Sequence, residues 1–141
     1  MKTACGPNVH MKTILATGEL SNLNNIYKAS LVAMMAGSDF IKTSTGKESV
    51  NATIPFGIVM CRAISDYHER TGYKVGLKPA GGLKTCQDAV NWLIMVKELL
   101  GDEWLSPKLF RFGASGLLGN IEQTLYKYAT GNMSVSYEFA L

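Results

Sequence analysis

The sequence predicts an α/β fold in which short buried strands alternate with amphipathic helices. Apolar segments of strand length alternate four times with longer segments in which apolar residues recur at helical spacing. A chain of 141 residues, with 47% hydrophobic and 18% charged residues, has the size and composition of one globular domain. Strands that alternate with helices form a parallel sheet through right-handed crossovers.

The first strand–helix unit comprises a predicted strand over residues 10–16 and a predicted helix over residues 21–37. Its strand, HMKTILA, ends in an apolar run that a Thr-Gly turn follows. The helix opens with the cap-forming residues Ser21 and Asn22 and closes on Gly37, which is the usual order of start and stop signals.

The second and third units follow the same pattern. Residues 39–43 predict a strand, and the helix after it runs from Pro55, which is tolerated in a first turn, to about residue 70. Residues 73–80 predict the third strand, and residues 85–100 carry apolar side chains at helical spacing.

The fourth unit comprises a predicted strand over residues 108–115 and a predicted helix over residues 117–130. Four such units form either a small open α/β sheet or half of an eight-stranded barrel. A complete barrel requires roughly 250 residues, so 141 residues cannot form one. In both architectures the functional groups gather in the loops at the carboxyl ends of the strands.

Composition and charge exclude several classes of function. The formal charge of +3 is small and its lysines and arginines are scattered, so we expect no nucleic-acid partner. We also expect no membrane partner, because no apolar run has the length of a membrane span. The unpaired spacing of Cys5, Cys61 and Cys86 indicates a reduced, cytoplasmic compartment, and neither they nor His10 and His68 predict a metal site.

Two lysines end neighbouring predicted strands. Lys42 ends the second strand and Lys78 ends the third. If these strands pair directly, the two ammonium groups repel, and one of them loses its proton nearer to neutral pH, as a nucleophilic lysine requires. The alternative is that both side chains extend past the strand ends into water, as most lysines do.

Glycine-containing loops follow the last two predicted strands. Gly81 and Gly82 come directly after the third strand, and Gly113 lies two residues before Ser115 at the end of the fourth. Such loops let backbone N–H groups approach an anion closely, and the helix start that follows adds its positive end. Each loop is also compatible with an ordinary tight turn between a strand and a helix.

The segments DFIKTSTGK, KPAGGLKT and RFGAS, in this order and spacing, resemble the deoxyribose-phosphate aldolase family, and its longer eukaryotic members in particular. The resemblance extends from about Ala4 to about Gly131, which is nearly all of the chain. It implies a class I aldolase, a lyase that works through a Schiff base without a metal or an organic cofactor. It also implies the C-terminal half of a TIM barrel, strands five to eight, over residues 1–131, followed by a tail over residues 132–141.

The resemblance also assigns roles to residues of this chain. Lys42 matches the Schiff-base lysine, and Lys78 matches the neighbouring lysine that lowers its pKa. Positions that hold the substrate phosphate match Lys47, Gly81, Gly82, Gly113 and Ser115. The implied reaction is reversible cleavage of 2-deoxyribose 5-phosphate, a small-molecule sugar phosphate, to acetaldehyde and glyceraldehyde 3-phosphate, in deoxyribonucleoside catabolism.

The chain departs from the family pattern in several places. The catalytic aspartate of the family lies on an earlier strand that this sequence does not contain, and Asp39 does not replace it. Lys84 stands where bacterial members have arginine, and Gly116 stands where they have a second serine. Tyr137 lies in the tail, where some members carry a tyrosine that assists proton abstraction.

Two alternatives to an active deoxyribose-phosphate aldolase remain open at this point. One is a catalytically weak or inactive remnant that binds a sugar phosphate or a partner without turnover. The other is a different lysine aldolase of related fold. Because four strand–helix units leave open sheet edges, we also expect a homo-oligomer or dependence on an N-terminal half.

Overall fold

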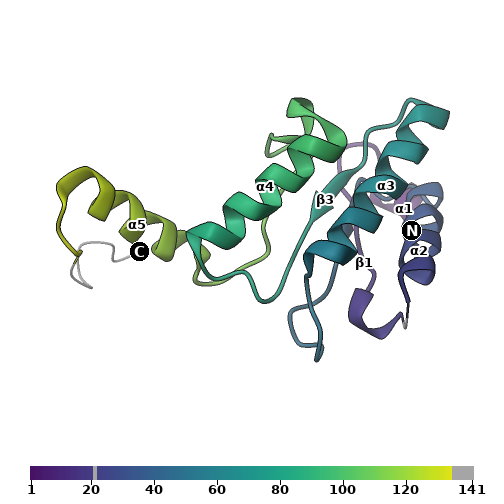
Figure 1. Cartoon of the computed structure of the whole chain (residues 1–141). Coiled ribbons are helices and arrows are strands. Elements are labelled where there is room, and N and C mark those ends of the chain that lie inside the picture. Colours follow the sequence, from purple (N-terminus) through teal and green to yellow (C-terminus); the bar gives the residue numbers. More distant parts are fainter. Residues whose placement is uncertain (21, 135–141) are drawn as a thin grey trace.

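The computed structural model describes residues 1–20 and 22–134, which form a parallel sheet with helices packed against it (Figure 1). The elements in chain order are α1 (Lys2–Cys5), β1 (Lys12–Ile14), the short helix η1 (Thr17–Glu19), α2 (Leu23–Met35), β2 (Phe40–Lys42), α3 (Ile54–Thr71), β3 (Gly76–Lys78), α4 (Cys86–Leu100), the short helix η2 (Asp102–Trp104) and α5 (Leu117–Thr130). The predicted α/β class and the four predicted helices are confirmed.

The sheet has the strand order β1–β2–β3, and both strand pairs are parallel. The three strands are shorter than the sequence predicts, but single hydrogen bonds extend the pairing beyond them. The N–H of Thr17 donates to the carbonyl of Thr43 at 2.9 Å, and the N–H of Thr43 donates to the carbonyl of Lys78 at 3.2 Å. Consecutive strands of the sequence are therefore neighbours in the sheet, which is the commoner arrangement.

The fourth predicted strand, residues 108–115, is wrong as a continuous strand. This segment runs parallel to β3 but forms two isolated bridges, which pair Leu77 with Phe110 and Ala80 with Gly113. The N–H of Gly113 donates to the carbonyl of Pro79 at 2.8 Å, but Pro79 has no N–H to donate to the carbonyl of Arg111, as the parallel pattern would require. We attribute the break between the two bridges to this missing donor, which lies midway along the pairing.

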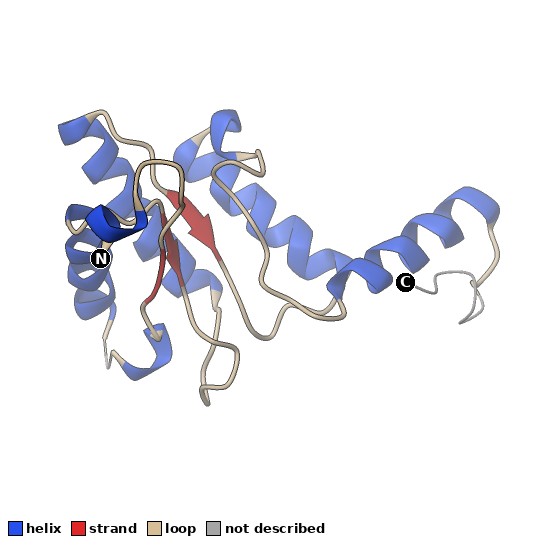
Figure 2. Ribbon diagram, turned by 180° about the vertical axis from the view of Figure 1, so that it is seen from behind, coloured by secondary structure: helices blue, strands red, loops and turns tan. Residues whose placement is uncertain are grey.

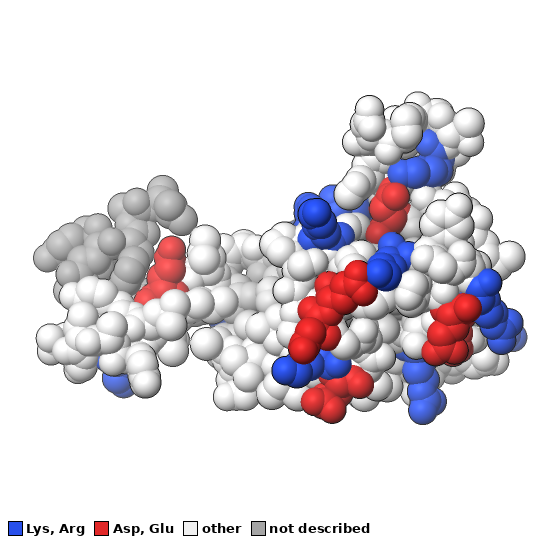
Figure 3. All heavy atoms as spheres, turned by 90° about the horizontal axis from the view of Figure 1, so that it is seen from above, with Lys and Arg blue, Asp and Glu red and all other residues white. Residues whose placement is uncertain are grey.

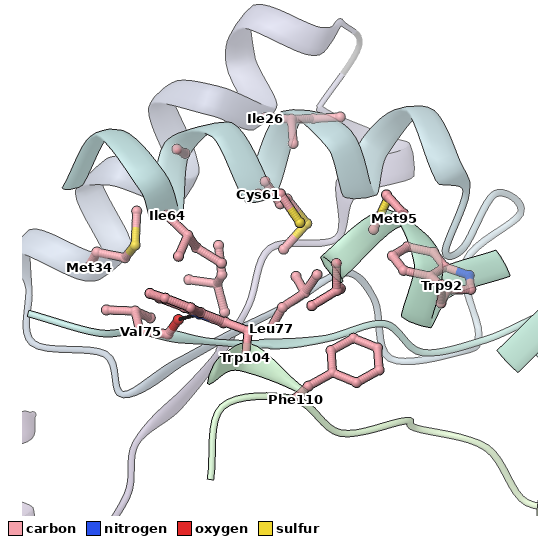
Figure 4. Close-up of a cluster of buried hydrophobic side chains, with 14 of the residues drawn as sticks. Ile26, Met34, Cys61, Ile64, Val75, Leu77, Trp92, Met95, Trp104 and Phe110 are labelled. Carbon is pink, nitrogen blue, oxygen red and sulfur yellow. Dashed lines mark hydrogen bonds between the residues drawn. The ribbon is translucent and has the colours of Figure 1, made fainter. Parts of the chain in front are cut away.

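Three long helices cover one face of the sheet. Figure 2 shows the strands in red beside these helices, and α3 contacts both α2 and α4. Because side chains alternate along a strand, the middle residues Ile41 and Leu77 face the helices and are completely buried in the core. Figure 4 shows Trp104 next to Val75, to whose carbonyl its indole N–H donates at 3.0 Å.

The three cysteines are free thiols, and Cys61 is a buried core residue on α3. Burial raises the pKa of the Cys61 thiol to about 12, so this group stays protonated and acts as a packing residue.

Local chemistry accounts for the helix boundaries. The Asn22 side chain caps α2 by accepting the N–H of Asn25 at 2.9 Å, while Ser21, the other predicted cap, lies outside the described residues. Thr53 caps α3 in the same way, and Thr85 and Asp88 form a reciprocal capping box at the start of α4. These bonds fix where each helix begins relative to the strand before it.

The opposite face of the sheet carries Phe40, Lys42 and Lys78. The ring of Phe40 lies against the glycine backbone at Gly76. Two cationic groups cover the same ring, with Lys12 Nζ 5.6 Å and the Arg111 guanidinium carbon 5.4 Å from its centroid. These side chains bury Phe40 on the face that lies away from the long helices.

The outer surface carries mixed charge. On the face that Figure 3 shows, the basic side chains are interspersed with acidic ones and do not merge into a basic patch. Among the residues that the structure describes, no helix has both the length and the apolar character needed to cross a membrane.

Candidate active site

The two predicted catalytic lysines lie side by side. β2 and β3 pair so that Lys42 is directly opposite Lys78, and both residues are the last of their strands. Residues paired in this way are on the same face of a sheet, about 5 Å apart between neighbouring strands. Both side chains therefore leave the sheet together at the edge where the carboxyl ends of the strands meet.

The environment of Lys42 favours its neutral amine. Partial burial lowers the pKa of Lys42, the positive charge of Lys78 lowers it further, and the negative charge of Glu48 opposes both effects. Lys42 Nζ also donates to the carbonyl oxygen of Ser44, two residues further along the chain. A lysine with a lowered pKa has a larger fraction of free amine at neutral pH, which is the nucleophilic form.

Replacing Lys78 with leucine should raise the pKa of Lys42, because the substitution removes the neighbouring positive charge. The pH dependence of the reaction of Lys42 with an aldehyde should then shift to more alkaline pH. Lys78→Arg is the matched control, since it keeps the charge and should leave the profile close to that of the unchanged chain. Identical profiles for the leucine variant and the unchanged chain would show that the two amines do not interact.

A cavity of about 580 Å³ lies among the loops that follow β2, β3 and the 108–113 segment. The five predicted phosphate-binding residues, Lys47, Gly81, Gly82, Gly113 and Ser115, all line it. Further lining residues are Thr45, Gly46, Leu83, Lys84, Ala114, Gly116 and Asn120. Three loops that are far apart in the sequence thus form one concave surface, which is lined by loop backbone and by two lysines.

Glycine is required at three positions of this surface for different structural reasons. Gly82 has a φ of +83° and open space where a side chain would begin, so its backbone is accessible from the cavity. Gly81 also has a positive φ, and a Cβ there would lie 2.6 Å from the Cβ of Asn51. A Cβ at Gly113 would lie 2.6 Å from the Cβ of Ala80 and 3.2 Å from the Cε of Lys78, so this glycine brings the cavity next to the second lysine.

Side-chain hydrogen bonds join the loops that follow β2 and β3. The backbone N–H of Ala80 donates to the Thr43 hydroxyl at 2.9 Å, and the Ser44 hydroxyl donates to the Ala80 carbonyl at 2.5 Å. Thr43 and Ser44 are fully buried, so these bonds are shielded from water. They hold the two lysine-bearing strand ends in a fixed relation to the cavity.

Comparison with known proteins identifies the family to which this architecture belongs. The sequence model of the DeoC/LacD family aldolases matches residues 1–117. This chain belongs to the DeoC/LacD aldolase family. It is 61% identical over 140 residues to a deoxyribose-phosphate aldolase of Mus musculus and 59% identical over 140 residues to that of Homo sapiens. Each alignment covers 99% of this chain and 44% of the relative, so the chain spans less than half the length of these relatives.

Solved structures of similar fold are also about twice as long as this DeoC/LacD family chain. A crystal structure titled as a putative deoxyribose-phosphate aldolase from Toxoplasma gondii matches with a TM-score of 0.75 at 21% identity. The match covers 89% of this chain and 49% of that chain, and at this identity it shows the fold alone. The predicted parallel α/β architecture is confirmed by this likeness.

Glu48, next to this DeoC/LacD site, is a residue that sequence reasoning did not single out. Its carboxylate accepts the backbone N–H groups of Thr45, Gly46 and Lys47 at 2.9–3.1 Å. A sequence signal existed, because Thr45-Gly46-Lys47-Glu48 has the spacing of a capping box, in which a Glu accepts the N–H of the residue three positions earlier.

The two helix starts near the cavity differ in how they are capped. The Asp88 carboxylate accepts the N–H groups of Lys84 and Thr85 at 3.0 and 2.8 Å, so it occupies the start of α4. The start of α5 follows Gly116, which lines the cavity and provides no side-chain cap. The first N–H groups of α5 are therefore the better donors for an anion in the cavity.

Asp39 lies away from the two lysines. Asp39 lies just before β2, at the end opposite Lys42, where its carboxylate contacts Lys2 Nζ at 2.6 Å and the N–H of Met11 at 2.7 Å. Burial acts to raise the pKa of Asp39, but these two donors outweigh it, so the pKa is lowered. The expectation that Asp39 is no substitute for the family aspartate agrees with this position, while Tyr137 lies outside the described residues.

Proposed function

We propose that this chain carries the Schiff-base half of a deoxyribose-phosphate aldolase, a cytoplasmic lyase that cleaves 2-deoxyribose 5-phosphate to acetaldehyde and glyceraldehyde 3-phosphate. The single observation that carries the proposal is the register of Lys42 opposite Lys78, next to Gly113, which lines the cavity. Family membership and the relatives of that name support the substrate.

The proposed reaction begins when the neutral amine of Lys42 attacks the C1 aldehyde carbon of the open-chain sugar. Loss of water gives an iminium ion, which acts as the electron sink. The C3 hydroxyl then loses its proton, the C2–C3 bond breaks, and the electron pair of that bond forms an enamine as glyceraldehyde 3-phosphate leaves. Protonation of the enamine at C2 and hydrolysis of the resulting iminium ion release acetaldehyde and the free amine.

Lys78 has a separate role in this scheme. Its positive charge lowers the pKa of Lys42, which increases the fraction of free amine there, and it assists proton transfer at the reacting carbons. The proton of the C3 hydroxyl passes to the family aspartate, which the resemblance assigns to an earlier strand than those of this sequence.

The proposed role of the cavity is to bind the phosphate at the far end of the substrate. Lys47 and Lys84 supply positive charge, Gly82 exposes backbone, and α5 begins beside Ser115 with uncapped N–H groups. Binding energy from the phosphate then positions C1 next to Lys42, although the phosphate itself does not react.

Replacing Gly82 with aspartate tests the proposed substrate. The carboxylate would extend into the cavity, where there is open space, and should raise KM for deoxyribose 5-phosphate far more than for deoxyribose. The measurement is a coupled retro-aldol assay with both sugars, on a chain completed with the remaining length of a relative. Gly82→Asn is the matched control, because it imposes the same positive-φ strain without the charge.

Two results of that assay would count against the proposal. Equal effects of Gly82→Asp on both sugars would show that the glycine serves only the fold. Binding of deoxyribose 5-phosphate without turnover in the completed chain would favour the alternative function, a remnant that binds the sugar phosphate and does not cleave it.

A further inference from the structure

The carboxylate of Glu48 lies in a turn whose backbone is arranged like an anion-binding site. Its Oε2 atom accepts four hydrogen bonds: three from the successive N–H groups of Thr45, Gly46 and Lys47, and one from the Thr45 hydroxyl at 2.8 Å. Gly46 has a φ of +93°, which turns the three N–H groups toward a common point. The turn therefore encloses an anion that belongs to the chain itself.

This arrangement determines which donors remain for a ligand. The residues from Thr45 to Lys47 line the cavity, but their N–H groups point to Glu48, which does not line it. A phosphate in the cavity would meet the Lys47 side chain and the loops around Gly82 and Ser115 instead. The hydrogen bonds lower the pKa of the Glu48 carboxyl to about 2, the largest contribution coming from the Thr45 N–H, so Glu48 is ionised at neutral pH.

The same loop is anchored on its other side. The Asn51 side chain donates to the carbonyl of Glu48 at 2.8 Å and lies where a Cβ of Gly81 would be. Glu48 is thus held between the strand end that carries Lys42 and the glycine loop that follows Lys78. Among the described residues, the charges that act on Lys42 are those of Lys78 and Glu48, and β1 places the apolar Ile14 beside Lys42.

We propose that Glu48 is a positioning residue of the aldolase site. It fixes the turn from Thr45 to Lys47 so that the Lys47 side chain faces the cavity. It also supplies the negative charge that faces Lys42. This inference rests on the proposed function for its meaning in catalysis. In the opposite role, Glu48 would compete with the substrate phosphate for the N–H groups of this turn. Removing its carboxylate would then tighten phosphate binding instead of weakening it.

The first test measures binding of inorganic phosphate by calorimetry on the full chain of 141 residues. Glu48→Ala should weaken phosphate binding by about threefold, because the turn loses its charged acceptor and Lys47 loses its fixed position. Deuterium exchange, read by mass spectrometry on the peptide containing residues 45–47, should become faster. Unchanged or tighter binding would overturn the proposal, and tighter binding would identify Glu48 as a competitor.

The second test measures the reactivity of Lys42 without any turnover. Trace acetylation across a pH series, read at each lysine by peptide mass spectrometry, gives the pH at which the Lys42 amine becomes neutral. Glu48→Gln keeps an acceptor oxygen but removes the charge, so the Lys42 curve should shift to lower pH. The matched control is Glu98→Gln on the exposed face of α4, which changes the net charge equally and should shift nothing.

If the pH dependence of Lys42 acetylation were the same in Glu48→Gln as in Glu98→Gln, the proposal that the Glu48 charge acts on Lys42 would be overturned. Neither measurement requires imine formation or sugar cleavage. Failure of the proposed function would appear instead as a completed chain that forms no imine at Lys42. The inference and the function on which it builds can therefore fail separately.

Discussion

Replacing Lys42 with arginine is expected to abolish both borohydride trapping with acetaldehyde and retro-aldol turnover in any active chain that contains this site. Arginine keeps a long cationic side chain at the end of β2, but its guanidinium stays protonated and cannot form the imine. The loss should be complete rather than graded, because no other group can replace the covalent step. Lys28→Arg is the matched control, since Lys28 is exposed on α2 and away from the cavity.

The assay for this variant is a coupled measurement of deoxyribose 5-phosphate cleavage, together with mass spectrometry after reduction with borohydride. Far-ultraviolet circular dichroism of both variants establishes that the fold is unchanged. An arginine variant that still formed the imine at the level of the Lys28→Arg control would contradict the assignment of Lys42.

A second prediction concerns self-association through the strand edge and the apolar surface that the described residues leave uncovered. We expect the chain of 141 residues to self-associate and to show little aldolase turnover, whereas a chain completed with the remaining length of a relative should be fully active. β1 is at the edge of the sheet, and a groove of about 600 Å³ lies between it and α2. Open strand edges beside apolar surface favour association.

Exposed apolar side chains on α2 and α5 are relevant to this expectation. On α2, Val32 lines the groove and is 65% exposed, and Met35, less than one turn further along the helix, is 74% exposed. On α5, which projects from the body of the molecule in Figure 1, Leu118, Leu125 and Tyr128 are 57%, 60% and 91% exposed. These three positions recur at helical spacing, so they form one apolar stripe that the described residues leave largely uncovered.

Sedimentation velocity and the coupled assay, applied to both chains, test this expectation. Val32→Lys should reduce association of the chain of 141 residues, while Val90→Lys on α4, outside the groove, should not. A monodisperse monomer with turnover equal to that of the completed chain would show that the open-edge interpretation is wrong.

Features that depend on nearby residues could be predicted from the sequence. The cap at Asn22, the capping box of Thr85 and Asp88, and the glycine after α4 each act within one turn of a helix, so the helix boundaries were predictable. The pairing of Lys42 with Lys78 was predictable for a related reason. Both residues end apolar runs of similar length in consecutive strands, and parallel strands place their carboxyl ends together.

Features that depend on backbone bonds between distant segments could not be predicted in the same way. The 108–115 segment has the composition of a strand, but its pairing is interrupted by Pro79, a residue of the neighbouring strand. The role of Gly113 depends likewise on contact with Ala80 and Lys78. Periodicity within one segment carries no information about such partners.

The location of the trapped adduct shows which lysine forms the imine. The completed chain is incubated with acetaldehyde, reduced with borohydride, digested and mapped by tandem mass spectrometry. If Lys42 is the nucleophile, one ethyl group should appear on Lys42 at neutral pH, and Lys78 should remain unmodified because it does not form the imine. An ethyl group on Lys78, or ethyl groups distributed over exposed lysines with none on Lys42, would contradict the account.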